Sequence, residues 1–110
     1  MLHCEHYRRG DCRSCKWLET PYPEQLAQKT AHLQQQLRGL DDSALTRFAP
    51  FQSLPAEFRN KAKMVVSGAV ERPILGILPN PTDPQSAVDL CDCPLYPQRF
   101  RVIFPVLKDF

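Results

Sequence analysis

Five cysteines gather in two short segments near opposite ends of the chain, and this distribution constrains the fold more than any other feature of the sequence. Three lie in the N-terminal stretch HCEHYRRGDCRSCKW, and two lie much later, in LCDCPLYP. An odd number of thiols leaves one over in any disulfide pairing. The first ten residues, MLHCEHYRRG, show no apolar leader, so we expect a cytoplasmic protein whose thiols stay reduced. A metal site therefore explains the cysteines better than disulfides do.

The spacing of the cysteines indicates which of them would act together. Cys12 and Cys15 form a C-x2-C pair, which lets two thiolates converge on one metal, and Cys4 lies close enough to loop back as a third ligand. The fourth must come from the distant segment. There Cys93 precedes a proline, as the last cysteine of the bacterial iron–sulfur signature does, so we choose Cys93 and interpret Cys91 as a spare thiol.

Three interpretations of the thiols remain open on these residues alone. Four thiolates can hold a [4Fe–4S] cluster, or they can hold tetrahedral zinc, and a disulfide is the third and weakest option. His3 and His6 could replace a thiolate on zinc, but we interpret them as surface residues beside the metal loop. A cross-link from this loop to Cys93 would contribute on the order of 4 kcal/mol through chain entropy.

Length and composition favour one folded domain, or one piece of a larger protein, and the helix and hairpin predicted below place it in the α+β class. The chain has 110 residues, of which 43% are hydrophobic and 24% charged, so it can bury a modest core. Eleven prolines divide it into short elements. A net charge of +2 does not by itself indicate a nucleic-acid partner. No apolar run approaches the ~20 residues that a bilayer requires, so no membrane association is expected.

The stretch TPYPEQLAQKTAHLQQQLRGL predicts an amphipathic helix. Thr20 can cap it, Pro21 suits its first position, and Gly39 suits its exit. The leucines that share one face are Leu26, Leu33, Leu37 and Leu40. Because they recur at helical spacing, we expect this helix to pack on the core.

The stretch EFRNKAKMVVSGAVERPILGILPN predicts an antiparallel hairpin, roughly over 58–70 and 73–79, around an ERP turn. Alternate residues of a strand share a face, so Arg59, Lys61 and Lys63 would line one side of it. Three such cations can follow a phosphate backbone, although a solvated strand face is the commoner meaning of a single basic triplet.

The remaining segments are predicted to be loops and one short helix. They are an irregular loop over 1–19, a linker over 41–56 anchored by Phe48 and Phe51, a turn-rich loop over 80–89, and an incipient helix after Pro97 that Pro105 would kink or restart. The C-terminal apolar run, Ile103, Phe104, Val106, Leu107 and Phe110, would have little left to pack on. We therefore expect this sequence to be part of a longer protein.

Three blocks of the sequence together resemble a known family. The blocks are C…GDCRSCKW…PYPEQLAQKT, FRNKAKMVVSG…ERPILGIL and DLCDCPLYP. In this order, and over nearly the whole chain, they resemble the N-terminal part of the RNA (uracil-5-)-methyltransferase family. The similarity is greatest to the type that acts on 23S rRNA and lacks an N-terminal TRAM domain.

The resemblance implies a cofactor and a set of ligands. Members hold a [4Fe–4S] cluster with cysteines in the pattern C…CxxC…CP, which by position are Cys4, Cys12, Cys15 and Cys93. It implies that residues 1–110 form the cluster-bearing domain, next to a Rossmann-like domain that uses S-adenosylmethionine (SAM). The cluster is expected to be structural or RNA-organising, because methyl transfer needs no redox step.

The resemblance also implies a reaction that these residues alone do not perform. In the family a catalytic cysteine adds to C6 of a flipped-out uracil, C5 then attacks the SAM methyl group, and a base removes the C5 proton. Here there is no Gly-rich SAM loop, no Asn-Pro-Pro motif and no Ser-Cys-Asn segment. We therefore assign none of the five cysteines as nucleophile. A free-standing zinc-binding or iron–sulfur-binding interaction module is the alternative function.

Overall fold

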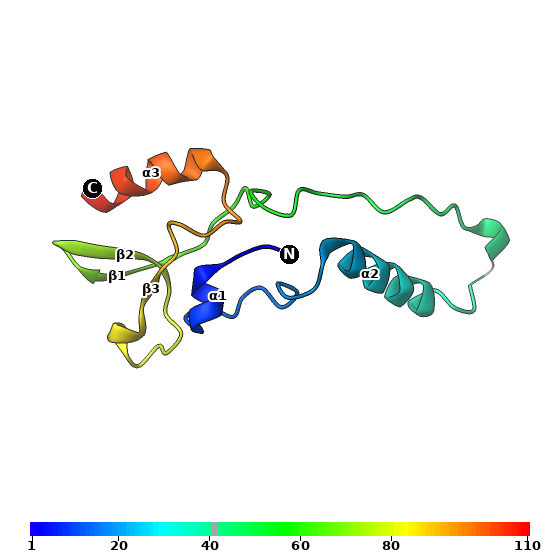
Figure 1. Cartoon of the computed structure of the whole chain (residues 1–110), viewed down its shortest axis with the longest axis horizontal. Helices are drawn as coiled ribbons and strands as arrows, with labels where there is room; N and C mark the ends of the chain where they lie inside the picture. The colour runs from blue at the N-terminus through cyan, green and yellow to red at the C-terminus, as the bar shows by residue number, and fades with distance from the viewer. Residues whose placement is uncertain (41) are drawn as a thin grey trace.

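The computed structural model describes residues 1–40 and 42–110. Its elements in chain order are α1 (Glu5–Arg9), α2 (Tyr22–Gln36), the 3-10 turn η1 (Asp42–Ala44), β1 (Val65–Ala69), β2 (Arg72–Ile77), the 3-10 turn η2 (Pro84–Ser86), β3 (Val88–Asp89) and α3 (Gln98–Asp109). In the described part of the chain, three strands form one antiparallel sheet in the order β1-β2-β3 (Figure 1). The predicted α+β class is confirmed. Within the same residues, no helix is long and apolar enough to cross a membrane.

The predicted hairpin is present, but its first strand is shorter than expected. Val65 lies opposite Gly76 and Ala69 opposite Arg72, so the turn consists of residues 70 and 71 rather than ERP. Residues 58–64 are not in a strand. β2 has only six residues, and its pairing with β1 is already complete at Val65. The alternating residues over 58–64 therefore lie beyond the part of the hairpin in which β1 is paired with β2.

A third strand, which the sequence did not indicate, closes the other side of β2. β3 occupies the end of the segment that was predicted to be a loop over 80–89, and the Leu90 amide donates to the Leu75 carbonyl at 2.9 Å. Gly76 makes this approach possible, because a Cβ atom there would lie 1.9 Å from the Val88 carbonyl oxygen. The chain therefore passes directly from the sheet into the second cysteine segment.

The core lies between the sheet and α3. Leu75, Tyr96 and Phe104 are buried together, and the Tyr96 and Phe104 rings meet edge to face with centroids 5.8 Å apart. α3 runs through Pro105 as one helix, so it does not restart there. Because Pro105 is exposed, the carbonyl that its missing amide leaves unbonded can turn to water.

The segment over 1–19 was predicted to be an irregular loop, but it contains the helix α1. Gly10 ends α1 with a φ of +86°, a left-handed conformation that glycine adopts without steric cost. α2 begins after Pro21, with no side-chain cap from Thr20, and Gly39 follows its end with a φ of +90°. The helix itself is therefore confirmed, whereas its predicted cap is wrong.

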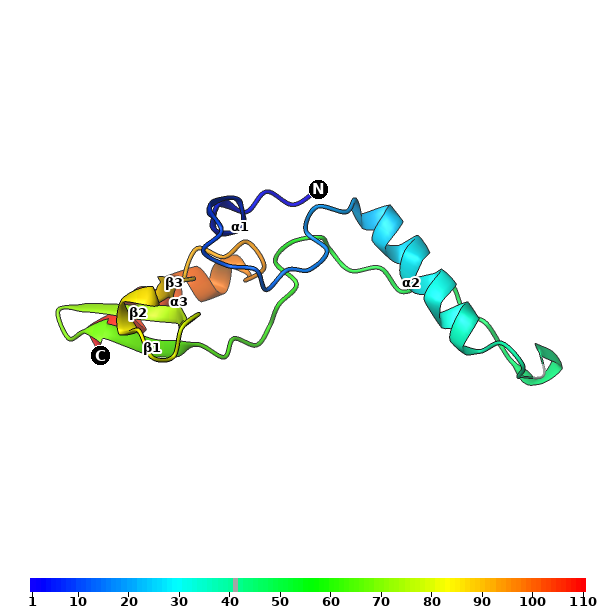
Figure 2. The same cartoon turned by 90° about the horizontal axis from the view of Figure 1, so that it is seen from below.

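The molecule is elongated, because α2 extends away from the sheet (Figures 1 and 2). Its radius of gyration is 18.7 Å, whereas a compact chain of this length has roughly 13 Å. None of the described residues of α2 is buried, so the predicted packing of its leucine face is wrong. Phe48 and Phe51 are 87% and 94% exposed and anchor nothing, also contrary to prediction. The periodicity of the leucines predicted the helix correctly, but it does not indicate whether another surface covers the leucine face.

Candidate metal centre

The first cysteine segment curls around the carbonyl of His6. This oxygen accepts the amides of Asp11 at 2.9 Å and Cys12 at 3.2 Å, which turns the chain back immediately after α1. Cys4 is the N-cap residue of α1. The turn therefore returns Cys12 toward the start of the helix and toward Cys4.

The second cysteine segment is a pair of tight turns after β3. The Cys93 amide donates to the Leu90 carbonyl at 3.1 Å, and the Tyr96 amide donates to the Cys93 carbonyl at 3.2 Å. The extended chain before β1 runs beside these turns, with the Arg59 amide 2.9 Å from the Leu95 carbonyl oxygen. This contact fixes the backbone of Arg59 beside the segment that carries Cys93.

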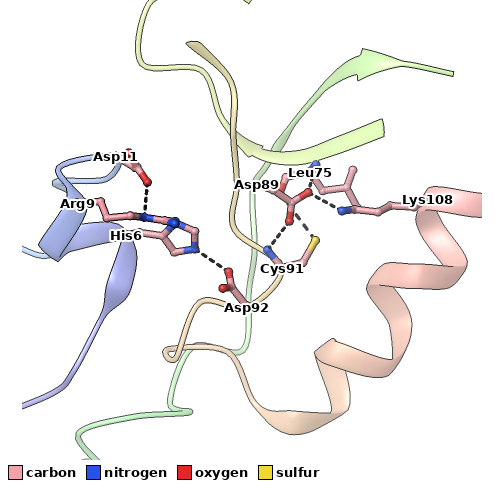
Figure 3. Close-up of polar contacts among 8 residues, drawn as sticks. All are labelled: His6, Arg9, Asp11, Leu75, Asp89, Cys91, Asp92 and Lys108. Atoms are coloured by element: carbon pink, nitrogen blue, oxygen red, sulfur yellow. Dashed lines mark hydrogen bonds and ion pairs between the residues drawn. The ribbon is translucent and has the colours of Figure 1, made fainter. Parts of the chain in front are cut away.

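A histidine–aspartate contact joins the two cysteine segments (Figure 3). His6 Nε2 lies 2.6 Å from Asp92 Oδ1, between residues 86 positions apart. His6 is buried, with only 7% of its surface exposed, so its interpretation as a surface residue is wrong. Its other ring nitrogen, Nδ1, is buried with no partner among the described residues. Asp92 was missed at the level of sequence, where its only signal was its position beside Cys93.

One cavity receives all four thiols that were predicted as ligands. It has a volume of about 160 Å³ and lies between the two cysteine segments and the sheet. The cysteines that line it are Cys4, Cys12, Cys15 and Cys93. His6, Tyr7 and Tyr96 line it as well, and the Arg13 guanidinium covers the Tyr7 ring at 4.4 Å. The fold thus brings together residues that the sequence separates widely.

The thiols share this cavity without converging on one point. Within residues 1–40 and 42–110, no three His, Cys, Asp or Glu side chains are grouped closely enough to hold a metal ion. Tetrahedral zinc requires sulfurs ~3.8 Å apart, given its Zn–S distance of about 2.3 Å. A cluster separates its thiolates further, because its own irons and sulfides occupy the space between them. Four thiolates are the donor set that either tetrahedral zinc or a [4Fe–4S] cluster requires.

Burial and neighbouring charges shift the pKa values of two of these thiols. Burial raises the pKa of Cys15 and of Cys93, and the charges of neighbouring thiolates raise both further. The Arg59 guanidinium acts in the opposite direction on both, but the net shift is upward. Both side chains therefore favour the thiol form in the protein alone.

Cys91 is not among the residues that line this cavity. Figure 3 shows its neighbours, which include Asp89 and Leu75. Its thiol lies 3.9 Å from the Leu75 carbonyl oxygen and also interacts with Asp89. Burial, together with the hydrogen bond to Asp89, raises the pKa of Cys91 to about 11. Cys91 therefore stays protonated at neutral pH.

The predicted basic residues are exposed, but they do not share a strand face. Arg59, Lys61 and Lys63 all precede β1, in a segment without strand structure. Arg59 and Lys63 line the cavity that holds the thiols, whereas Lys61 does not. No local pattern indicated that Arg59 would line the same cavity as Cys15 and Cys93.

Comparison with known proteins identifies the family. No protein-family model matches the chain, and no solved structure matches it. Curated relatives do match, and their names describe uracil-C5 methyltransferases of ribosomal RNA; the whole of this chain corresponds to their N-terminal part.

The particular relatives are the 23S rRNA (uracil(747)-C(5))-methyltransferases RlmC. The protein from Haemophilus influenzae strain PittEE is 63% identical over 110 residues, which is 100% of this chain and 28% of the relative. The protein from Mannheimia succiniciproducens is 61% identical over 107 residues, and that from Pasteurella multocida 59% over 109 residues. They are matched over 28% and 27% of their own length, so the chain spans little more than a quarter of these relatives.

Proposed function

We propose that this chain is the cluster-bearing, RNA-contacting N-terminal part of a cytoplasmic, SAM-dependent 23S rRNA uracil-C5 methyltransferase. The observation that carries the proposal is the 63% identity to an RlmC protein along the whole chain. Methyl transfer belongs to the complete enzyme, with SAM binding and the nucleophile in the part of the relatives that this chain does not cover. The chain alone would not be catalytic.

The cofactor of this part is proposed to be a [4Fe–4S] cluster held by Cys4, Cys12, Cys15 and Cys93. Support comes from the cavity that these four cysteines line together. When bound, the cluster supplies a cross-link between two segments that are distant in sequence. His6 and Asp92 join the same segments in the protein itself, and so hold the thiols of the two segments near one another.

The RNA contact is proposed for Arg59, Lys61 and Lys63. All three are exposed, and Arg59 is held by its backbone next to the metal centre. Side chains of this kind bind phosphates irrespective of base, so they would position 23S rRNA rather than read its sequence.

The cofactor proposal is tested by measuring metal and sulfide on protein purified without oxygen. We expect about four irons per chain, matching inorganic sulfide, and broad absorption near ~400 nm. A single tightly bound zinc with no iron would contradict the cluster and favour the alternative interaction module.

A matched pair of cysteine variants makes the test specific to the site. Cys93→Ser is expected to lose most of the iron, because it removes a ligand from the cavity. Cys91→Ser changes a thiol two positions away that lies outside the cavity, and is expected to keep it. Equal iron loss in both variants would show that the loss reflects the segment's folding and not ligation by Cys93.

A further inference from the structure

A second, larger cavity lies beside the metal centre. It has a volume of about 530 Å³ and is enclosed by the N-terminal loop, the first turns of α2 and the segment over 51–59. Cys15, Arg59 and Leu95 line both cavities, so the two share a wall. The function proposed above assigns no role to this space.

Specific hydrogen bonds hold the walls of this cavity in place. The Gln25 side chain donates to the carbonyls of Trp17 at 3.0 Å and Thr20 at 2.8 Å, which fastens the N-terminal loop to α2. The Ser53 amide donates to the Tyr22 hydroxyl at 2.9 Å, which fastens the returning segment to the same helix. Three segments that are distant in sequence are thus fixed around one space.

The chemistry of the lining is aromatic and cationic. Its aromatic side chains are Trp17, Tyr22, Phe51 and Phe58, and its cationic side chains are Lys16, Lys29 and Arg59. No Asp or Glu among the described residues lines it. The Lys29 ammonium lies over the Trp17 ring, 5.8 Å from its centre. Phe51 reaches this cavity while 94% exposed, so its ring is free to contact a ligand.

We propose that this cavity, hereafter the Trp17 pocket, binds a nucleotide of single-stranded RNA. Aromatic faces stack on unpaired bases, and neighbouring cations without carboxylates attract the phosphates on either side. The proposal rests on the RNA contact proposed above and names a different surface for it. Because Cys15 belongs to both walls, a filled metal centre would also set the shape of the RNA pocket.

The chain contains one tryptophan, so its fluorescence reports on this pocket alone. The experiment titrates the 110-residue protein, purified without oxygen, with a labelled single-stranded oligouridylate of about 10 nucleotides. Anisotropy of the label measures binding, and Trp17 emission measures stacking. We expect saturable binding with quenching of Trp17 at the same concentration, and much weaker binding of the corresponding duplex, whose bases are already stacked.

Two phenylalanines provide a matched pair of variants. Phe51→Ala is expected to weaken binding by about 5- to 150-fold, the range for loss of one base–aromatic stack. Phe48→Ala removes a ring that is also exposed but does not line the pocket, and is expected to leave binding unchanged. Neither ring is buried, so neither variant should lose structure, which far-ultraviolet circular dichroism checks.

The outcomes separate the pocket from the general RNA contact. RNA binding without a change in Trp17 emission, and with equal effects of the two variants, overturns the pocket while leaving the RNA contact standing. No binding of RNA overturns both. An oligoglutamate peptide that quenches Trp17 and displaces the RNA, or quenching by increasing protein concentration alone, overturns the pocket as an RNA site and assigns it to an acidic peptide or a second copy.

Discussion

At the scale of single residues, a few side chains connect segments that the sequence keeps far apart. Lys108, in the last turn of α3, bonds to Asp89 at the end of β3 (Figure 3). Burial would raise the pKa of Asp89, but hydrogen bonds from Lys108 and from the Cys91 and Leu75 amides prevail and lower it. The same contact raises the pKa of Lys108. Both charges are therefore stabilised in the folded protein.

This pair predicts a specific loss of stability in acid. Because the folded pKa of Asp89 lies below its unfolded value, its contribution is present above about pH 4 and is lost as pH falls through the folded pKa. Lys108→Met should lower the free energy of unfolding by about 1 kcal/mol at pH 7, since both groups remain partly exposed. It should also flatten the acid dependence seen in urea unfolding. Lys61→Met, at an exposed position, is the control, and parallel pH profiles for the wild type and Lys108→Met would contradict the assignment.

Sequence spacing anticipated which thiols would share a cavity, but not the polar contacts around them. The C-x2-C spacing indicated Cys12 and Cys15, and the proline that follows Cys93 indicated that residue. His6 and Asp92 carry no such pattern, because their pairing depends on how the sheet and α1 are placed. Contacts between distant residues are properties of the fold, and a local pattern does not encode them.

At the scale of elements, the sequence predicted where regular structure forms better than where it ends. α2 and the hairpin follow from local periodicity and turn residues, which act within a few positions. The strand predicted over 58–70 begins only at Val65, because a strand also needs a partner of matching length. β3 has only two residues, too few to show alternation, so nothing in the sequence could indicate it.

Gly76 provides a test of how closely β2 and β3 approach. In Gly76→Ala the new methyl group would meet the Val88 carbonyl, so the strands must separate, at a cost of about 1–3 kcal/mol. Hydrogen exchange of the Leu90 amide, which donates to Leu75, should accelerate accordingly. Gly39→Ala is the contrasting variant: none of the described residues lies within 4 Å of its added carbon, and its left-handed backbone is the source of strain. Unchanged exchange at Leu90 in Gly76→Ala would refute the close approach.

At the scale of the whole molecule, apolar side chains remain uncovered where a compact domain would bury them. The C-terminal apolar residues, which we expected to have little to pack on, are exposed apart from Phe104, which lies in the core. The exposed apolar residues of α3 and the chain end are Val102, Ile103, Val106, Leu107 and Phe110. α2 likewise leaves Leu33 more than half exposed. Periodicity in the sequence identified these apolar faces, but no local pattern indicates which surface would cover them.

The exposed face of α3 predicts association in solution. We expect the isolated chain to associate with rising concentration, as sedimentation velocity would measure, because contiguous apolar surface leaves water when two copies meet. Val106→Lys should suppress the association, since Val106 is 66% exposed on that face. Val70→Lys changes an equally apolar, 92% exposed side chain in the hairpin turn and should not. A monomer at all concentrations, unaffected by either variant, would count against the prediction.

The separation of the two cysteine segments also has a consequence for biosynthesis. Residues 16–92 lie between Cys15 and Cys93 and must be translated before the four thiols can meet. At about 5–20 residues per second, Cys4, Cys12 and Cys15 wait roughly 4–15 s for their partner. During that interval they are accessible to oxidants as an incomplete set. The order of synthesis, rather than affinity, would thus set the earliest moment at which the proposed metal centre could be filled.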